Sequence, residues 1–552
     1  MKRPLLLAFL LAAGMPDALH AQRAIHDSGG PLPASQAAYD VTYYDLALRV
    51  DPATETIRGS LAAHVRVVDA MRHLVLDLDT LLAVDSVTTV APDGLGRLTV
   101  TREGGQIQID LGRVHEPGER VGARVWYGGS PLSAPHVPRS WSDGFFWAET
   151  PSGAPWISVV TVLNGSDIWF PVKDHPSDEP DSMSIRITAP ADLVVAANGR
   201  LRGVRDEGDG TRTHDWFVSD PINNYSVSIN LAPYVVLEEE YESVTGERFP
   251  FIFWVLPEFE REGREAMPGF MRDMRFLEET LGPYPFRQDK FGVVHTPYYG
   301  MEHQSINAYG SDFRLNEWGF DGLFFHELTH EWWANMVTAR DWKDWWIHES
   351  FGSYMTPLYA EHIGGKEAYR SALPRRPFTF AEEMPIAPRE VQTTRDIYGG
   401  HIYGKGSFVL HTLRGLIGRE ATLAAIRLFA YPDPVAAYEP GCRCRLAETA
   451  EFVRTAEATS GRQLQWFFDA YLHRAELPVL KTDRDEDLVH FRWETGGLPF
   501  PMPLEVRVDG VTHRLAMKEG LGTLYAPAGA AIEIDPDGWV LMHVAGEHQR
   551  SP

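Results

Sequence analysis

The chain has 552 residues, of which 44% are hydrophobic and 23% are charged, a globular composition that excludes a disordered or fibrous protein. The net charge of −25, from 51 basic and 76 acidic residues, argues against nucleic acid or an anionic membrane as a partner. The only two cysteines, Cys442 and Cys444, exclude a disulfide scaffold and a cysteine-ligated zinc site. At about 100–200 residues per domain, this length predicts about three domains.

The N-terminus has the pattern of a signal peptide. Two basic residues precede an apolar run that ends at Met15, and Ala21 offers a cleavage point. The run is too short to span a bilayer as a helix. We therefore expect residues 1–21 to be a signal peptide and residues 22–37 a linker, so the protein would be exported, either periplasmic or secreted. A buried N-terminal helix is the alternative.

Residues 38–235 are predicted to form a β domain. Leu46, Leu48 and Val50 alternate with polar or small neighbours, as in a half-buried strand. Glycine-containing turns punctuate the region, and no convincing helix is expected before residue 257. The further predicted strands span residues 57–68, 74–82, 185–187 and 193–197.

Residues 236–477 are predicted to form a helix-rich domain that starts with strands at 251–255 and 291–295. Apolar residues then recur with helical spacing, and glycines mark several helix ends. The predicted helices span residues 258–281, 317–336, 347–363, 405–417, 419–429, 447–460 and 462–473.

After Pro478 the pattern returns to short strands between glycine and proline turns. Residues 478–552 are therefore predicted to form a small β domain that packs on its neighbour. Its predicted strands span residues 489–493, 504–508, 513–517 and 531–534.

A metal-binding motif lies within the predicted helix 317–336. His326 and His330 are four residues apart, so they share one helix face and both imidazoles can reach one ion. Glu327 lies between them and can face the open coordination position of the metal. Zinc hydrolases commonly use three protein ligands and a water. Glu349 fits as the third ligand, because an antiparallel helix return can bring it beside the histidines.

The alternative for this motif is two exposed histidines on an amphipathic helix. The spacing to Glu349 and the surrounding tryptophans disfavour that alternative. In a zinc hydrolase the metal lowers the pKa of its water toward about 7 and polarises the substrate carbonyl. Glu327 would take the proton of that water and pass it to the leaving amine. The negative oxygen of the intermediate needs a further donor, for which a tyrosine hydroxyl is suited.

With these motifs, the sequence resembles the aminopeptidase N family of zinc metallopeptidases (gluzincins), which includes leukotriene hydrolase. The resemblance covers nearly the whole chain after the predicted signal peptide. Four segments carry it: His326-Glu327-Leu328-Thr329-His330 with eighteen residues before Glu349; Gly300-Met301-Glu302-His303, similar to the family's Gly-x-Met-Glu-Asn; Tyr403-Gly404-Lys405-Gly406, similar to its Tyr-x-Lys-Gly; and Asp178-Glu179-Pro180.

The resemblance implies a multidomain α+β fold: an N-terminal β-sheet domain, a thermolysin-like helix-rich catalytic domain and a C-terminal β-sandwich. No C-terminal helical domain is expected. Because such a domain covers the active site in larger relatives, a more open cleft is expected here. It also implies roles for single residues. One zinc ion would be bound by His326, His330 and Glu349; Glu327 would be the general base; Tyr403 would stabilise the oxyanion; Glu302 would bind the free α-amino group; and the backbone of Gly300 and Met301 would hold the peptide extended.

The sequence departs from the family pattern at three places. His303 stands where the motif has Asn, and Tyr299 stands where Gly is usual. The family's first domain supplies a Gln or Glu that helps to hold the substrate's amino terminus, and neither occurs between Gly153 and Pro171. These departures concern recognition of the amino terminus and leave the hydrolytic centre unchanged.

The leading hypothesis is a zinc aminopeptidase that acts on exported or extracellular peptides with a free N-terminus. A zinc endopeptidase of the thermolysin-like type is the first alternative, and a non-catalytic peptide-binding module on the same fold is the second. Hydrolysis of an epoxide, as in leukotriene hydrolase, is a remote alternative without support from a lipid pocket. The pairing of Cys442 and Cys444 stays open at this stage, with two unpaired loop residues favoured over a strained disulfide.

Overall fold

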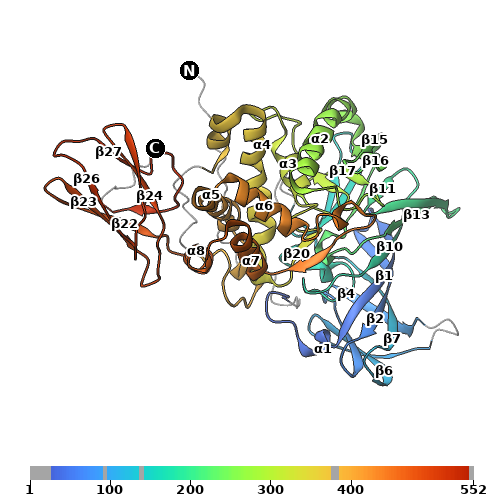
Figure 1. The fold of residues 1–552 in the computed structure, drawn as a ribbon. Coiled ribbons are helices and arrows are strands. Elements are labelled where there is room, and N and C mark those ends of the chain that lie inside the picture. The colour runs from blue at the N-terminus through green and yellow to red at the C-terminus, as the bar shows by residue number, and fades with distance from the viewer. Residues whose placement is uncertain (1–26, 91–95, 136–141, 375–383, 546–552) are drawn as a thin grey trace.

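The computed structural model describes residues 27–90, 96–135, 142–374 and 384–545. The predicted signal peptide and the first residues of the predicted linker lie outside this range. The fold is α+β, as predicted: β-sheets form the N-terminal part, helices the middle and short strands the C-terminal part (Figure 1). The predicted domain boundaries at 235 and 477 stay predictions. Strand β15 begins at Val235, and strand β22 begins at Val479.

The N-terminal part consists of β-sheets around a core of their own. Its strands are β1 (Tyr39–Asp51), β2 (Thr56–Val67), β3 (Met71–Asp77), β4 (Leu82–Thr89), β5 (Thr99–Glu103), β6 (Gln106–His115), β7 (Arg120–Gly129), β8 (Gly144–Glu149), β9 (Pro155–Val160), β10 (Ser182–Pro190), β11 (Val194–Ala197), β12 (Arg200–Asp206), β13 (Thr211–Val218) and β14 (Ile229–Ala232).

These strands form three sheets. The largest has the order β12-β13-β10-β1-β2-β7-β4, and within it β1 pairs with β10 in parallel. The other two have the orders β11-β14-β9-β8 and β3-β6-β5. The alternation predicted in β1 is confirmed, because Leu46, Leu48 and Val50 are all buried.

The expectation of no helix before residue 257 was wrong for a few short turns. These are too short to show helical periodicity in the sequence. They are α1 (Ala34–Ala37), η1 (Ser166–Ile168) and η2 (Asn224–Ser226).

The middle part packs helices against a five-stranded sheet of order β15-β16-β17-β19-β18. Its strands are β15 (Val235–Glu242), β16 (Arg248–Val255), β17 (Phe291–His295), β18 (Gly300–Met301), β19 (Asn307–Tyr309), β20 (Val337–Ala339) and β21 (Arg445–Ala447). Its helices and helical turns are η3 (Pro257–Phe259), α2 (Glu260–Leu281), α3 (Gly322–Thr329), η4 (Trp342–Asp344), α4 (Trp346–Ala372), η5 (Thr394–Asp396), η6 (His401–Lys405), α5 (Gly406–Ile417), α6 (Arg419–Ala430), η7 (Ala436–Tyr438), α7 (Thr449–Ser460) and α8 (Gln465–Tyr471).

The predicted bounds of one helix were wrong. The helix expected at 317–336 is only α3, because the side chain of Asp321 caps its N-terminus by accepting from the backbone N–H groups of Leu323 and Phe324. After Thr329 the chain continues in turns, so His330 is the C-cap residue and not an interior one. The helix expected at 347–363 ends where predicted, because the backbone of Gly365 is not helical, with φ at 73°, and a second helical segment of α4 follows this break.

The C-terminal part forms two small sheets, of order β26-β23-β22-β28 and β25-β24-β27. It extends away from the helices at the left of Figure 1, but its buried side chains belong to the same core cluster as theirs. The imidazole of His411 on α5 stacks on Trp539, which anchors the two parts. The strands are β22 (Val479–Asp485), β23 (Leu488–Glu494), β24 (Leu504–Val508), β25 (Val511–Leu515), β26 (Leu521–Tyr525), β27 (Ile532–Ile534) and β28 (His543–Val544).

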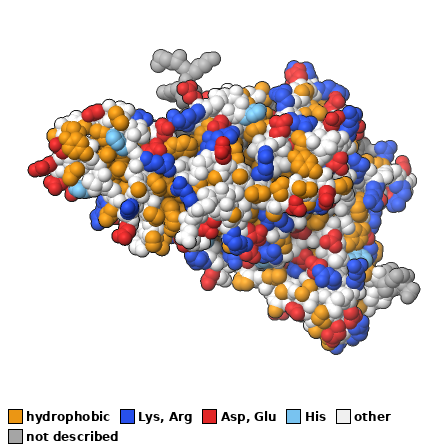
Figure 2. Space-filling view, in the orientation of Figure 1, with side chains coloured by type: hydrophobic (Ala, Val, Ile, Leu, Met, Phe, Trp, Pro, Cys, Tyr) orange, Lys and Arg blue, Asp and Glu red, His pale blue; other side chains and the backbone are white. Residues whose placement is uncertain are grey.

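The surface mixes charges of both signs. On the face drawn in Figure 2, acidic and basic side chains are interspersed, so the negative net charge does not form one acidic patch there. Within the part of the chain that the structure describes, no helix combines the length and the apolar character that crossing a membrane would require.

Candidate active site

The three predicted metal ligands lie together where α3 meets α4. The Nε2 atoms of His326 and His330 are 3.2 Å apart. The Oε2 atom of Glu349 lies 3.6 Å from Nε2 of His326 and 3.5 Å from Nε2 of His330. Their ligand atoms all fall within 4.8 Å of one another, which is the arrangement that one ion requires.

Close contact between the two helices places Glu349 there. Gly352, one turn further along α4, faces α3, and a Cβ atom at this position would lie 2.8 Å from Oγ1 of Thr329 and 3.0 Å from Cε1 of His330. A larger residue would displace the hydroxyl of Thr329 or the ring of His330, one of the three predicted ligands. The sequence Glu349-Ser350-Phe351-Gly352 therefore supplies both the carboxylate and the space that it needs.

The donor set fits a zinc ion. Nδ1 of His330 lies 2.8 Å from the backbone oxygen of Trp333, so it carries the proton and leaves the lone pair of Nε2 free for a metal. Burial lowers the pKa of His330 to about 4, which keeps the ring neutral. Oε2 of Glu349 is buried and accepts no hydrogen bond from the described residues. Two imidazole nitrogens and one carboxylate are a common zinc set in hydrolases.

Glu327 lies beside this trio and directly under β18. Burial first, and then the charge of Glu349, raise the pKa of Glu327 well above its usual range, so its carboxyl group readily takes up a proton. A Cβ atom on Gly300 would lie 2.5 Å from Oε1 of Glu327. A larger residue at position 300 would therefore displace the carboxyl group of Glu327.

Tyr403 reaches the same centre from η6, a single turn of π-helix, a form that is frequent at functional sites. Its hydroxyl donates to Oε1 of Glu349 at 2.8 Å and lies 2.6 Å from the hydroxyl of Tyr398. Burial is the main cause that raises the pKa of Tyr403, so the phenol keeps its proton. The turn is held against α4 because Ser350 donates to the backbone oxygen of Ile402.

Glu302 completes a group of three buried carboxyl groups with Glu327 and Glu349. Its ligand atom falls within 4.8 Å of those of Glu327 and His330. Burial, followed by the charges of Glu349 and Glu327, raises the pKa of Glu302 well above its usual range. Such a group of carboxyl groups gains from a cation placed between them, either a metal or an ammonium.

The structure also places residues here that the sequence did not indicate. Tyr225, from the N-terminal part, donates its hydroxyl to Oε1 of Glu302 at 3.1 Å. His348 lies against Tyr225, and Asn335 donates to the backbone oxygen of Glu302 at 2.9 Å. His348 and Asn335 adjoin the motifs and could have been examined for that reason, but Tyr225 has no sequence signal at all.

The two residues that depart from the family motif differ in their exposure to solvent, since His303 is fully buried and Tyr299 is exposed.

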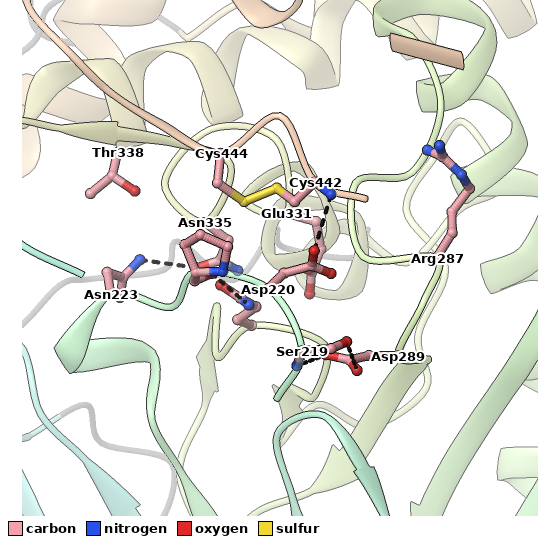
Figure 3. Close-up of a disulfide and its surroundings, with 12 residues drawn as sticks. Ser219, Asp220, Asn223, Arg287, Asp289, Glu331, Asn335, Thr338, Cys442 and Cys444 are labelled. Atoms are coloured by element: carbon pink, nitrogen blue, oxygen red, sulfur yellow. Dashed lines mark hydrogen bonds between the residues drawn. A yellow bond between two sulfur atoms is a disulfide. The ribbon is translucent and has the colours of Figure 1, made fainter. Parts of the chain in front are cut away.

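Cys442 and Cys444 form a disulfide, so the favoured expectation of two unpaired residues was wrong (Figure 3). The backbone N–H of Cys442 donates to Oδ1 of Asp220 at 3.0 Å. Asn223, three residues further along, donates to Oδ1 of Asn335 at 3.4 Å. The disulfide loop therefore contacts the segment of the N-terminal part that leads to Tyr225.

Comparison with known proteins agrees with this arrangement. Residues 269–471 match the peptidase family M1 domain. Aminopeptidase N of Streptomyces lividans is 29% identical over 404 residues, which are 65% of this chain and 44% of that protein. Aminopeptidase N of Haemonchus contortus is 25% identical over 318 residues, which are 51% of this chain and 32% of that protein. This chain therefore spans less than half the length of these curated relatives.

Solved structures share the fold. An M1 zinc metallopeptidase from Deinococcus radiodurans superposes with a TM-score of 0.63 at 22% identity, covering 80% of this chain and 95% of that one. A two-domain M1 zinc metallopeptidase superposes with a TM-score of 0.64 at 22% identity, covering 82% of this chain and 98% of that one. Together these matches confirm the resemblance to the aminopeptidase N family that the motifs predicted.

Proposed function

We propose that this chain, whose residues 269–471 are a peptidase family M1 domain, is a zinc-dependent aminopeptidase that hydrolyses the N-terminal peptide bond of peptides. The observation that carries the proposal is the buried carboxyl group of Glu302 beside His326, His330, Glu349 and Glu327. A carboxylate beside the proposed metal ligands can bind the ammonium group of a substrate, which places the first peptide bond next to the metal centre and Glu327. We further propose one zinc ion, and an exported enzyme with exported or extracellular substrates, the latter from the signal-peptide pattern.

Each residue of the site has a separate proposed role in the hydrolysis. Zinc, when bound by His326, His330 and Glu349, would supply Lewis acidity and a lowered pKa of water. Glu327 accepts the proton of the attacking water and delivers it to the leaving amine. Tyr403 donates its hydroxyl to the oxygen that becomes negative in the transition state.

The substrate backbone is proposed to lie along β18. This strand is at the edge of its sheet, so its outer side can pair with an extended peptide. Gly300 and Met301 would supply these backbone contacts, and the close approach of Gly300 to Glu327 brings the paired peptide to the base. A mutant of the Deinococcus radiodurans M1 zinc metallopeptidase binds a Tyr-Ser-Ala substrate, which supports peptides as the substrate class.

The test compares an amino-acid arylamide with the same compound acetylated at its nitrogen. The wild type is expected to cleave the free amine much faster. Glu302→Gln should lower kcat/KM for the free amine by about 10- to 100-fold, the value of a hydrogen bond to a charged group, and should leave the acetylated compound unchanged. Equal hydrolysis of both compounds by the wild type would refute the aminopeptidase proposal.

An endopeptidase is the second candidate, because no Gln or Glu between Gly153 and Pro171 is available to help hold the amino terminus. Cleavage within a peptide blocked at both ends would favour it. The non-catalytic alternative requires that the wild type hydrolyse neither kind of substrate, with or without added zinc.

Replacement of Tyr403 with phenylalanine is expected to lower kcat by about 10²- to 10³-fold with little change in KM. The hydroxyl would act only once negative charge develops on the carbonyl oxygen, so substrate binding does not need it. Steady-state kinetics on the arylamide measure this split. The control is Tyr359→Phe. Tyr359 lies on α4, and its hydroxyl donates to Asp273 at 2.8 Å. A rise in KM alone for Tyr403→Phe would contradict the assignment.

A further inference from the structure

We propose that Tyr225 is a positioning residue for Glu302, and that the N-terminal part of the chain thereby sets the preference for substrates with a free amino group. The inference rests on the proposed function of Glu302 and deepens it. It assigns a role to a residue that lies 77 positions upstream of Glu302 in the sequence.

Tyr225 is held at the site by contacts on two sides. Its hydroxyl donates to Oε1 of Glu302 at 3.1 Å, and its ring packs on Trp345 with the ring centroids 5.2 Å apart. The side chain is buried, so no bulk water competes with this hydrogen bond. With Oε1 engaged, the carboxyl group of Glu302 keeps one orientation, and Oε2 is left for an incoming ammonium group.

His348 determines the direction of the proton on Tyr225. Nε2 of His348 accepts the backbone N–H of Ala339 at 2.8 Å and therefore carries no proton. The proton of the neutral ring must be on Nδ1, which faces the hydroxyl oxygen of Tyr225 at 3.4 Å. Nδ1 can then only donate, so the single proton of the tyrosine hydroxyl is directed to Glu302. The order of donors is Ala339 to His348, His348 to Tyr225, and Tyr225 to Glu302.

The turn that carries Tyr225 is fastened to the segment that carries Glu302. Ser226 donates its hydroxyl to Oδ1 of Asn335 at 2.7 Å, and the side-chain amide of the same Asn335 donates to the backbone oxygen of Glu302 at 2.9 Å. Asn198 bridges the two segments again, donating to the backbone oxygens of Ser226 and Gln304 at 2.8 Å each. The relative position of Tyr225 and Glu302 is therefore set by backbone anchors on both sides.

This arrangement also bears on the lack of a first-domain Gln or Glu that would help to hold the substrate's amino terminus. No Gln or Glu lies between Gly153 and Pro171, yet the N-terminal part still contacts Glu302, the proposed binding position of the amino group, through Tyr225 in η2. A phenol cannot replace a carboxylate as a partner of the ammonium group. It can keep Glu302 in the orientation that binds the ammonium group, which is a positioning role.

The test is the selectivity ratio, defined as kcat/KM for an amino-acid arylamide divided by kcat/KM for the analogue that lacks the amino group. Tyr225→Phe should lower this ratio about tenfold, mainly through a higher KM for the amine, while zinc content stays at the wild-type level. A merely structural defect would lower both values of kcat/KM and leave their ratio unchanged.

A double-mutant cycle separates positioning from independent effects. If Tyr225 acts through Glu302, adding Tyr225→Phe to Glu302→Gln should cause no further loss of the ratio. The matched control is Tyr234→Phe, a buried tyrosine whose hydroxyl donates to the backbone oxygen of His295 at 2.9 Å, and it should leave the ratio unchanged.

Three outcomes would overturn the inference: an unchanged ratio in Tyr225→Phe, additive losses in the double mutant, or an equal loss in Tyr234→Phe. A wild type without preference for the amine would instead refute the proposed function, and the inference with it. The two failures are therefore distinguishable from the wild-type ratio alone.

Discussion

Replacing His330 with alanine is expected to abolish zinc binding and to lower kcat/KM by at least about 10³-fold, because Lewis acidity and water activation are worth several kcal/mol to the reaction. His330 lies 3.2 Å from His326 and 3.5 Å from Glu349, and its replacement would leave only two of the three proposed ligands. The measurements are zinc per chain after dialysis and turnover of the arylamide. A chelator added to the wild type should produce the same loss, and restored zinc should reverse it.

The control for this variant is His362→Ala. His362 lies on α4, but it is exposed and packs on Phe276, away from the trio. It should keep both zinc and activity. Full turnover by His330→Ala with no zinc bound would contradict the assignment of the metal centre.

Glu327→Gln is expected to lower kcat by about 10²- to 10⁴-fold while zinc content and KM change little. The amide has the shape of the carboxyl group but cannot accept the proton of the attacking water. Glu327 is not among the three proposed ligands, so its replacement separates loss of the base from loss of the metal. Zinc content, KM and kcat measured on one preparation show which of the two has occurred.

Glu331→Gln provides a matched control on the same segment. Burial raises the pKa of Glu331 to about 8, so this side chain is mostly neutral at pH 7 and glutamine resembles it closely. Its Oε1 accepts from the backbone N–H of Ser305 and the side-chain amide of Asn307, which the amide oxygen of glutamine can also do, and the contacts of Oε2 are longer, at 3.3 Å to the backbone N–H of Ser305 and 3.5 Å to the hydroxyl of Tyr284. We expect activity close to that of the wild type. Retained turnover in Glu327→Gln would contradict the assignment of Glu327 as the general base.

The sequence alone was sufficient to select His326, His330 and Glu349 as candidate ligands. Two histidines four residues apart share a helix face wherever the helix lies, so their spacing is a local property. The position at which that helix ends could not be predicted from local spacing. Tertiary packing buries Trp332, Trp333 and Met336 although they follow the end of α3, and their burial extended the apolar pattern past the helix.

What only the tertiary structure decided is which distant residues meet Glu302. Tyr225 and Asn335 come from separate segments and donate to Glu302, and His348 contacts Tyr225 from a third segment. Composition and periodicity report burial and local spacing, and neither records a hydrogen bond between residues 77 positions apart. The sequence by itself thus determined the histidine pair and the α+β class, because both depend on local order, whereas contact between α3 and α4 brings Glu349 to the pair. The packing of Tyr225, in the turn η2, against Trp345 and His348 decided how the site around Glu302 is completed.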